Sequence, residues 1–208
     1  MPKLHLEVTE YIDGNVVSIL ESRLGSKFEI GKYKFVSRNS VDEIPQYIAL
    51  IASTPFWTAL SVAGALFCKK LIELSTEDFY DATKRKFKKA SDNDVEKIAN
   101  DLSTAQESST RSFQYALKLV LSEEKSYGAA IVIRSDDPIE YAKTIAKFSM
   151  ISQELHALLE CAGPIVGEML VHFATDNDAL VEWMDHKMER HSRCIPLPVD
   201  DEASGLPV

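Results

Sequence analysis

The sequence predicts an α+β domain in which antiparallel hairpins pack against several helices. Short stretches alternate apolar and polar residues, as half-buried strands do, and longer stretches repeat apolar residues at helical spacing between N-cap and glycine signals. The two kinds of stretch do not follow one another in a regular strand-helix repeat, which favours an α+β domain over a doubly wound sheet. The centre of the predicted fold is a helical segment, 44–74, in which residues 44–68 carry no charge.

This central segment is broken at Pro55. Proline suits the first turn of a helix better than its interior, so we expect one helix over 45–53 and a second from Pro55 to Leu74, with Thr54 as its N-cap. The alternative is a membrane span, which needs about 20 mainly apolar residues. The segment reaches that length only if a helix continues through Pro55, and we therefore favour a buried core element.

The N-terminal part predicts a strand, a helix and a hairpin. Residues 4–8 alternate apolar and polar side chains, which indicates a strand, and 15–24 form an amphipathic helix that ends at a glycine. Within 28–35 the apolar residues move from even to odd positions. This change predicts a type II′ hairpin with a two-residue turn at Gly31 and Lys32. A single strand with a bulge at Gly31 is the alternative.

The middle of the chain predicts two more helices and a strand pair. A capping signal at Ser75 begins one helix, and residues 94–106 form the other. Residues 113–121 alternate as a strand, and 129–133 indicate a more buried partner strand.

Asp137 and Pro138 begin a helix that we expect to run to about Cys161. Residues 171–183 are typical of a hairpin, although a helix capped by Asn177 or Asp178 also fits. Proline and acidic residues from Ile195 onward predict a disordered tail, so the domain is expected to cover 1–194 and the tail 195–208.

Charge and cysteine content restrict the class of protein. A net charge of -9 and a pI near 5.1 argue against a nucleic-acid binder, because phosphate contacts need a basic surface. The 3 cysteines follow no CxxC pattern, and the N-terminus carries charges where a signal peptide would be apolar. These features predict a reducing, cytoplasmic setting.

The last third holds the side chains most suited to metal binding or catalysis. Glu168 and His172 would meet on a helix but not on the strand we favour, and His186, His191 and Cys194 match no zinc pattern. His156 and Cys161, on one helix, lie five positions apart and do not face each other. No phosphate loop, nucleophile elbow or HExxH motif occurs, so we expect neither a metal nor a cofactor.

Two features suggest contact with a partner. Residues 69–90 carry seven basic and four acidic side chains, +3, against -12 for the rest of the chain. If Phe56 and Trp57 were exposed, they would add an apolar patch. The candidate partner-binding residues are Phe56, Trp57, Lys84, Arg85, Lys86, Lys88 and Lys89.

The sequence therefore favours a soluble intracellular binding or interaction protein without catalysis of its own, acting on a protein partner or as a homo-oligomer. One alternative is a membrane-associated protein that inserts residues 44–68 and holds the surface with a basic flank at 69–89. A second alternative is a metal-dependent or hydrolytic enzyme that uses the histidines and glutamates of the last third.

Overall fold

The structure is a computed structural model of the chain, and it describes residues 4–9, 14–25, 28–33, 47–73, 94–108, 114–121, 128–133, 135, 137–175 and 177–197. The predicted helix beginning at Ser75 and the basic residues 84–89 lie outside these residues. The α+β class is confirmed, since helices and strands follow one another irregularly along the described chain and the strands form a mixed sheet.

The strands form one 8-stranded sheet in the order β2-β1-β3-β4-β5-β6-β7-β8. They are β1 (Leu4–Thr9), β2 (Phe28–Tyr33), β3 (Tyr47–Ser53), β4 (Gln114–Val120), β5 (Gly128–Ile133), β6 (Met169–Phe173), β7 (Asp178–Met184) and β8 (Arg190–Pro196). The pairs β1–β2, β3–β4 and β5–β6 are parallel, and the other neighbours are antiparallel.

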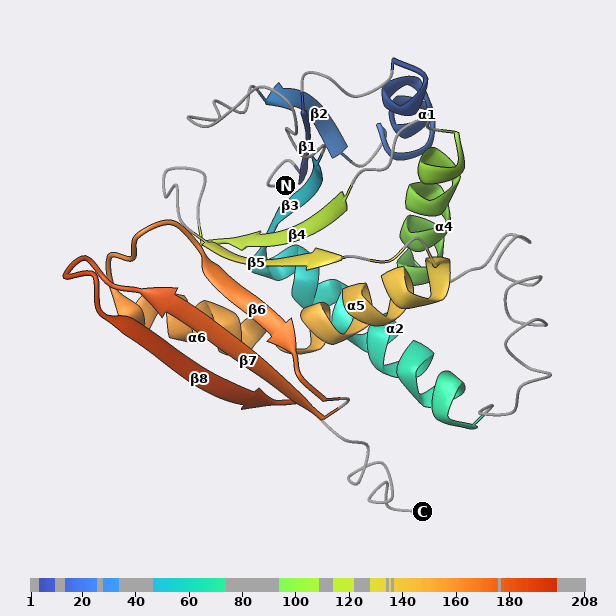
Figure 1. Cartoon of the computed structure of the whole chain (residues 1–208). Helices are drawn as coiled ribbons and strands as arrows, with labels where there is room; N and C mark the ends of the chain where they lie inside the picture. Colours follow the sequence, from blue (N-terminus) through green and yellow to red (C-terminus); the bar gives the residue numbers. More distant parts are fainter. Residues whose placement is uncertain are drawn as a thin grey trace.

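The described helices connect the parallel pairs. They are α1 (Gly14–Leu24), α2 (Thr54–Glu73), α4 (Asp94–Glu107), α5 (Pro138–Met150) and α6 (Ser152–Ala162). A parallel pair needs a crossover connection, which α1 supplies for β1–β2 and α5 with α6 supply for β5–β6. Figure 1 shows α2 and α5 side by side beneath β4 and β5, with α6 behind β6, β7 and β8.

The hydrophobic core lies between these helices and one face of the sheet. Alternate strand residues such as Leu117, Ile131 and Val171 join buried residues of α1, α2, α4, α5 and α6 in a single cluster. Ile51 and Ala130 are also buried, but they point to the other face and are not part of that cluster. The described helices therefore cover one face of the sheet, and none of them lies on the other face.

Helix α2 is anchored in this core. Trp57 is fully buried, and its indole Nε1 donates to the carbonyl oxygens of Ala52 and Lys118, each at 3.2 Å. Leu60 is buried as well, so these two large residues of the second predicted helix are enclosed by the fold.

The first predicted helix of the central segment, 45–53, is wrong, because its described residues, Tyr47–Ser53, form strand β3 between β1 and β4. The periodicity of a short apolar run does not distinguish a buried strand from a buried helix. The preference of proline for the first turn of a helix favoured the helix, which was the wrong choice. The described part of this segment, 47–68, is thus divided between a strand and a helix. Within the described residues, no helix has both the length and the apolar character that a membrane crossing requires.

The predicted hairpin at 28–35 is also wrong. Strand β2 runs without a turn through Gly31 and Lys32 and pairs in parallel with β1, with Gly31 opposite Glu7. The apolar residues change from even to odd positions within this stretch, but no turn causes the change. Strand β2 lies at the edge of the sheet and pairs with β1, which comes earlier in the chain.

The C-terminal half follows the prediction with two corrections. The helix from Pro138 is interrupted at Ile151, whose φ of -95° and ψ of 8° separate α5 from α6. The β6–β7 hairpin is confirmed, but the chain continues into β8, and the buried Ile195 and Leu197 overturn a tail boundary at 195. The Leu197 N–H donates to the Asn177 carbonyl at 2.7 Å, which ties this end to the β6–β7 turn.

Candidate functional site: the open face of the sheet

The face of the sheet that the helices leave uncovered is called the open face below. Strand alternation places on it Ala49 and Ile51 of β3, Ala116 and Lys118 of β4, Ala130 and Val132 of β5, Leu170 and His172 of β6, Leu180 and Glu182 of β7, and Ser192 and Cys194 of β8. One row of paired residues crosses from Ile51 to Ser192 through Lys118, Ala130, Leu170 and Glu182.

The middle of the open face is apolar. Val132 and Leu170, on the neighbouring strands β5 and β6, are among the exposed large hydrophobic side chains, and Leu170 is 49% exposed. Ala130 lies beside Leu170, and Ala116 lies beside Val132. A sheet face that only meets water normally carries polar residues at these positions. The apolar centre therefore has the composition of a surface that another molecule covers.

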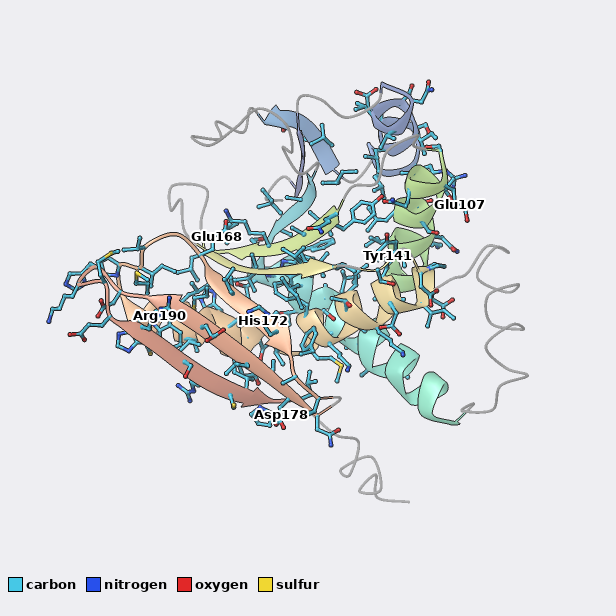
Figure 2. The ribbon with its side chains drawn as sticks, in the orientation of Figure 1. Glu107, Tyr141, Glu168, His172, Asp178 and Arg190 are labelled. Atoms are coloured by element: carbon cyan, nitrogen blue, oxygen red, sulfur yellow. The ribbon has the colours of Figure 1, made fainter. Side chains whose placement is uncertain are left out.

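Ion pairs border this apolar centre. Lys118 on β4 pairs with Glu168, which directly precedes β6, so the contact spans β5. The imidazole of His172 lies 3.7 Å from the carboxylate of Glu182 on the adjacent strand β7. Figure 2 shows Glu168 at the beginning of β6 and His172 near its end. The Lys118–Glu168 pair is therefore neutral as a unit.

Glu168 and His172 are not brought together, since they lie at opposite ends of β6 and each contacts another residue. This arrangement confirms the strand prediction that argued against a shared metal. Of the residues proposed for partner binding, Trp57 lies in the core and Phe56 packs partly against it. The basic residues Lys84, Arg85, Lys86, Lys88 and Lys89 lie outside the described residues.

A cluster of ligand-type side chains lies at the β7–β8 turn. Ligand atoms of Asp185, Glu189 and His191 lie within 4.8 Å of one another, whereas His186 and Cys194 do not join this group. Asp185 accepts hydrogen bonds from the backbone N–H groups of Lys187 at 2.8 Å and Glu189 at 3.0 Å. The Glu189 amide is the main reason that the pKa of Asp185 lies below its usual value, and His191 adds to the effect.

The hydrogen bonds of Asp185 explain the cluster as part of the turn. Its carboxylate also lies 3.1 Å from His191 Nε2, and the His191 ring stacks on Trp183 at 5.4 Å between centroids. Met188 within the turn has a positive φ of 67°, which an Asx-type turn helps to maintain. The carboxylate that would bind a metal is thus already used to close the hairpin.

A hydroxyl, an imidazole and a carboxylate form a line where α2 meets α6. Thr54 Oγ1 lies 2.7 Å from Nδ1 of His156, and the other ring nitrogen lies 3.4 Å from the carboxylate of Glu160. Such an order could pass a proton from the hydroxyl to the imidazole. It also joins the start of α2 to α6, which is a structural role. Cys161 is exposed on the same helix.

A hollow of about 350 Å³ lies between α5 and the β6–β7 turn. It is lined by Glu140, Lys143, Thr144, Lys147, Phe173, Ala174 and Thr175. Its charges are engaged locally, since Lys143 pairs with Glu140 at 2.8 Å and the Lys147 ammonium lies 5.6 Å from the Phe173 ring centre.

Comparisons with protein-family models, curated proteins and solved structures gave no match. The class of the protein is therefore defined by its own geometry: an α+β domain with a helical layer on one face of a mixed sheet. Sequence reasoning missed Val132 and Leu170. Both residues are apolar at strand positions that would be polar if one face of the sheet met water. The sequence could not reveal this, because it does not show whether helices cover one face of the sheet or both.

Proposed function

We propose that this protein is an intracellular interaction protein that binds a protein partner through the open face of its sheet. The observation that carries the proposal is the exposed apolar pair Val132 and Leu170 in the middle of a face that no described helix covers. Burying apolar surface contributes roughly 25 cal/mol per Å², so a complementary surface would gain affinity by covering this pair.

The border of the open face indicates what the partner surface is like. Lys118 pairs with Glu168, and His172 lies beside Glu182, so these side chains offer a polar rim around the apolar centre. Interfaces of this composition have an apolar centre and a solvated polar edge. We therefore infer an uncharged, apolar contact patch on the partner, and the exposed free thiols of Cys161 and Cys194 support a reducing, cytoplasmic setting.

The proposal is tested by placing a photo-crosslinking amino acid at position 132 or 170 in the native cells. We expect both positions to capture the same protein, and Leu170→Asp to prevent its co-purification while the circular dichroism and melting temperature stay unchanged. A crosslinker at the exposed Glu21 of α1 is the control. Equal capture from position 21, or no shared protein from 132 and 170, would overturn the proposal.

One observation favours a catalytic alternative, namely the line of Thr54, His156 and Glu160. If this line acted as a nucleophile with its base, the wild-type protein would release p-nitrophenol from simple esters, and Thr54→Val would abolish the release. We expect the two proteins to hydrolyse the ester equally slowly. A rate that depends on Thr54 would replace the interaction proposal with a hydrolase.

A further inference from the structure

Helix α2 carries a second apolar surface, on the side away from the core. Its exposed residues Pro55, Ala59, Val62 and Leu66 recur at spacings of four, three and four, and they are called the outer stripe below. Val62 is 69% exposed and Leu66 is 62% exposed. Trp57, Leu60 and Gly64 lie buried on the opposite side of the same helix.

An outer stripe of this kind is unusual for a surface helix. Such helices normally turn charged or polar residues outward, yet α2 has no charged residue from Thr54 to Cys68. The spacing is that of the apolar seam along which two helices pack at a small angle. The residues next to the stripe, including Ser61 and Ala65, are small and would let a second helix approach.

We propose that the outer stripe binds a second copy of this chain, with the two α2 helices antiparallel across a two-fold axis. The four stripe positions are symmetric about the point between Leu60 and Ser61. An axis at that point sets Ala59 opposite the partner's Val62, and Pro55 opposite the partner's Leu66. Each contact then joins a smaller residue to a larger one, which is how facing helices fill space without voids.

Charge supports the antiparallel orientation. Lys69 and Lys70 follow the stripe in the sequence of α2, so a parallel pair would set two basic helix ends side by side. In the antiparallel pair, the basic end of each helix approaches the start of the other, where Glu160 of α6 is linked to Thr54 through His156. Antiparallel helix dipoles add a small favourable contribution. The uncharged stripe also lets two chains of net charge -9 meet without direct repulsion.

The size of the contact determines its strength. The stripe spans eleven residue steps, or about 17 Å of helix at 1.5 Å per residue. One helix face buries less than the roughly 800 Å² per partner of a standard interface, so we expect dissociation constants of about 1 to 100 μM. Because α2 lies on the covered side of the sheet, the dimer would keep both open faces free and offer two partner sites. The dimer does not depend on the proposed function.

Sedimentation analysis of the purified chain over a range of concentrations tests the dimer. We expect reversible dimerisation of the wild type, and at least tenfold weaker association for Val62→Glu and for Leu66→Glu, since each would bury an unpaired charge twice. Both residues are exposed, so the variants should fold, and having two of them keeps the test valid if one does not. Met188→Glu, a similar change at a residue that is 65% exposed in the β7–β8 turn, should dimerise like the wild type.

A wild type that stays monomeric at every concentration up to about 1 mM, well above the expected range, would overturn the proposal. A dimer that both stripe variants preserve would overturn it too, because another surface would then form the contact. Orientation is tested by Glu160→Lys, which should weaken the dimer about threefold to fivefold by placing like charges together. An unchanged dissociation constant for this variant would rule out the antiparallel arrangement.

Discussion

Gly64 of α2 lies directly against Ala146 of α5, so that a Cβ atom at position 64 would be 2.9 Å from the Ala146 Cα. The missing side chain allows the two helices to pack closely. This close contact fixes the rotation of α2 about its axis, because the side that carries Gly64 must face α5. The same rotation places the outer stripe in solvent.

Gly64→Ala should destabilise the protein. The added methyl group would meet the backbone of Ala146 and the Ser149 hydroxyl, and separating α2 from α5 should cost about 1–3 kcal/mol of unfolding free energy. Urea denaturation measures the loss. Gly14→Ala is the control, because a Cβ at Gly14 meets nothing within 4 Å. Equal stability of both variants would show that α2 and α5 are not in close contact.

Trp57→Phe should cost about 1–3 kcal/mol. Phenylalanine keeps an aromatic ring against Phe148 but lacks the Nε1–H that now serves the carbonyls of Ala52 and Lys118. Phe56→Leu, which removes a partly buried ring with no such donor, is the comparison. If the Trp57 variant melted like the wild type, the indole hydrogen bonds would not contribute to stability.

Leu170 and Val171 are neighbours on β6 that point to opposite faces of the sheet. Val171 is 1% exposed, and Val171→Asp should lower the unfolding free energy by about 3–5 kcal/mol because it buries a charge. Leu170→Asp should change it by less than about 0.5 kcal/mol. Thermal melts of the two variants compare the faces directly. Similar losses would mean that the open face is covered by the protein itself.

The β7–β8 turn should weaken in acid. Because the Glu189 amide and His191 lower the pKa of Asp185, its carboxylate stabilises the turn fully above the pKa of the unfolded chain, near 3.8. The contribution is lost as the pH falls through the lower folded pKa. Amide exchange of Lys187 and Glu189 can be followed by NMR from pH 6 to pH 2. The protection of these two amides relative to their intrinsic exchange rates should fall below about pH 3.8. In Asp185→Asn this extra acid sensitivity should disappear.

Zinc should not raise the melting temperature. The Asp185 carboxylate accepts two backbone hydrogen bonds and contacts His191, so a metal ion would have to displace the bonds that close the turn. A melt with and without excess Zn²⁺ decides the matter. A rise that Asp185→Asn removes would establish a metal site that our account does not include.

Elements whose stability is local could be predicted from the sequence. The Asp137 side chain accepts from the Ile139 N–H at 3.1 Å and Pro138 begins α5, as their residue types indicate. Gly25 ends α1 because a Cβ there would clash with the Glu21 carbonyl. The apolar stripe of α4 and the alternation of β4 likewise reflect burial on one side only.

Elements that depend on distant pairing could not be predicted. Strand β3 lies between β1 and β4, and residues that point to both of its faces are buried. Its sequence is therefore a continuous apolar run, which a buried helix would also show. Strand β8 has mostly exposed side chains and is held by its backbone pairing with β7, which leaves almost no apolar pattern. The open face was missed for a related reason, since one sequence does not reveal which sheet faces the helices cover.

Hydroxyl-radical footprinting tests the central claim, that the open face is free in the isolated chain and covered by its partner. In the purified protein, Val132 and Leu170 should be oxidised readily, whereas Leu117 and Leu119 of the covered face should be protected. In native cells, Val132 and Leu170 should become protected while the exposed Met188 stays reactive. Oxidation of Val132 and Leu170 to the same extent in both settings would contradict the account.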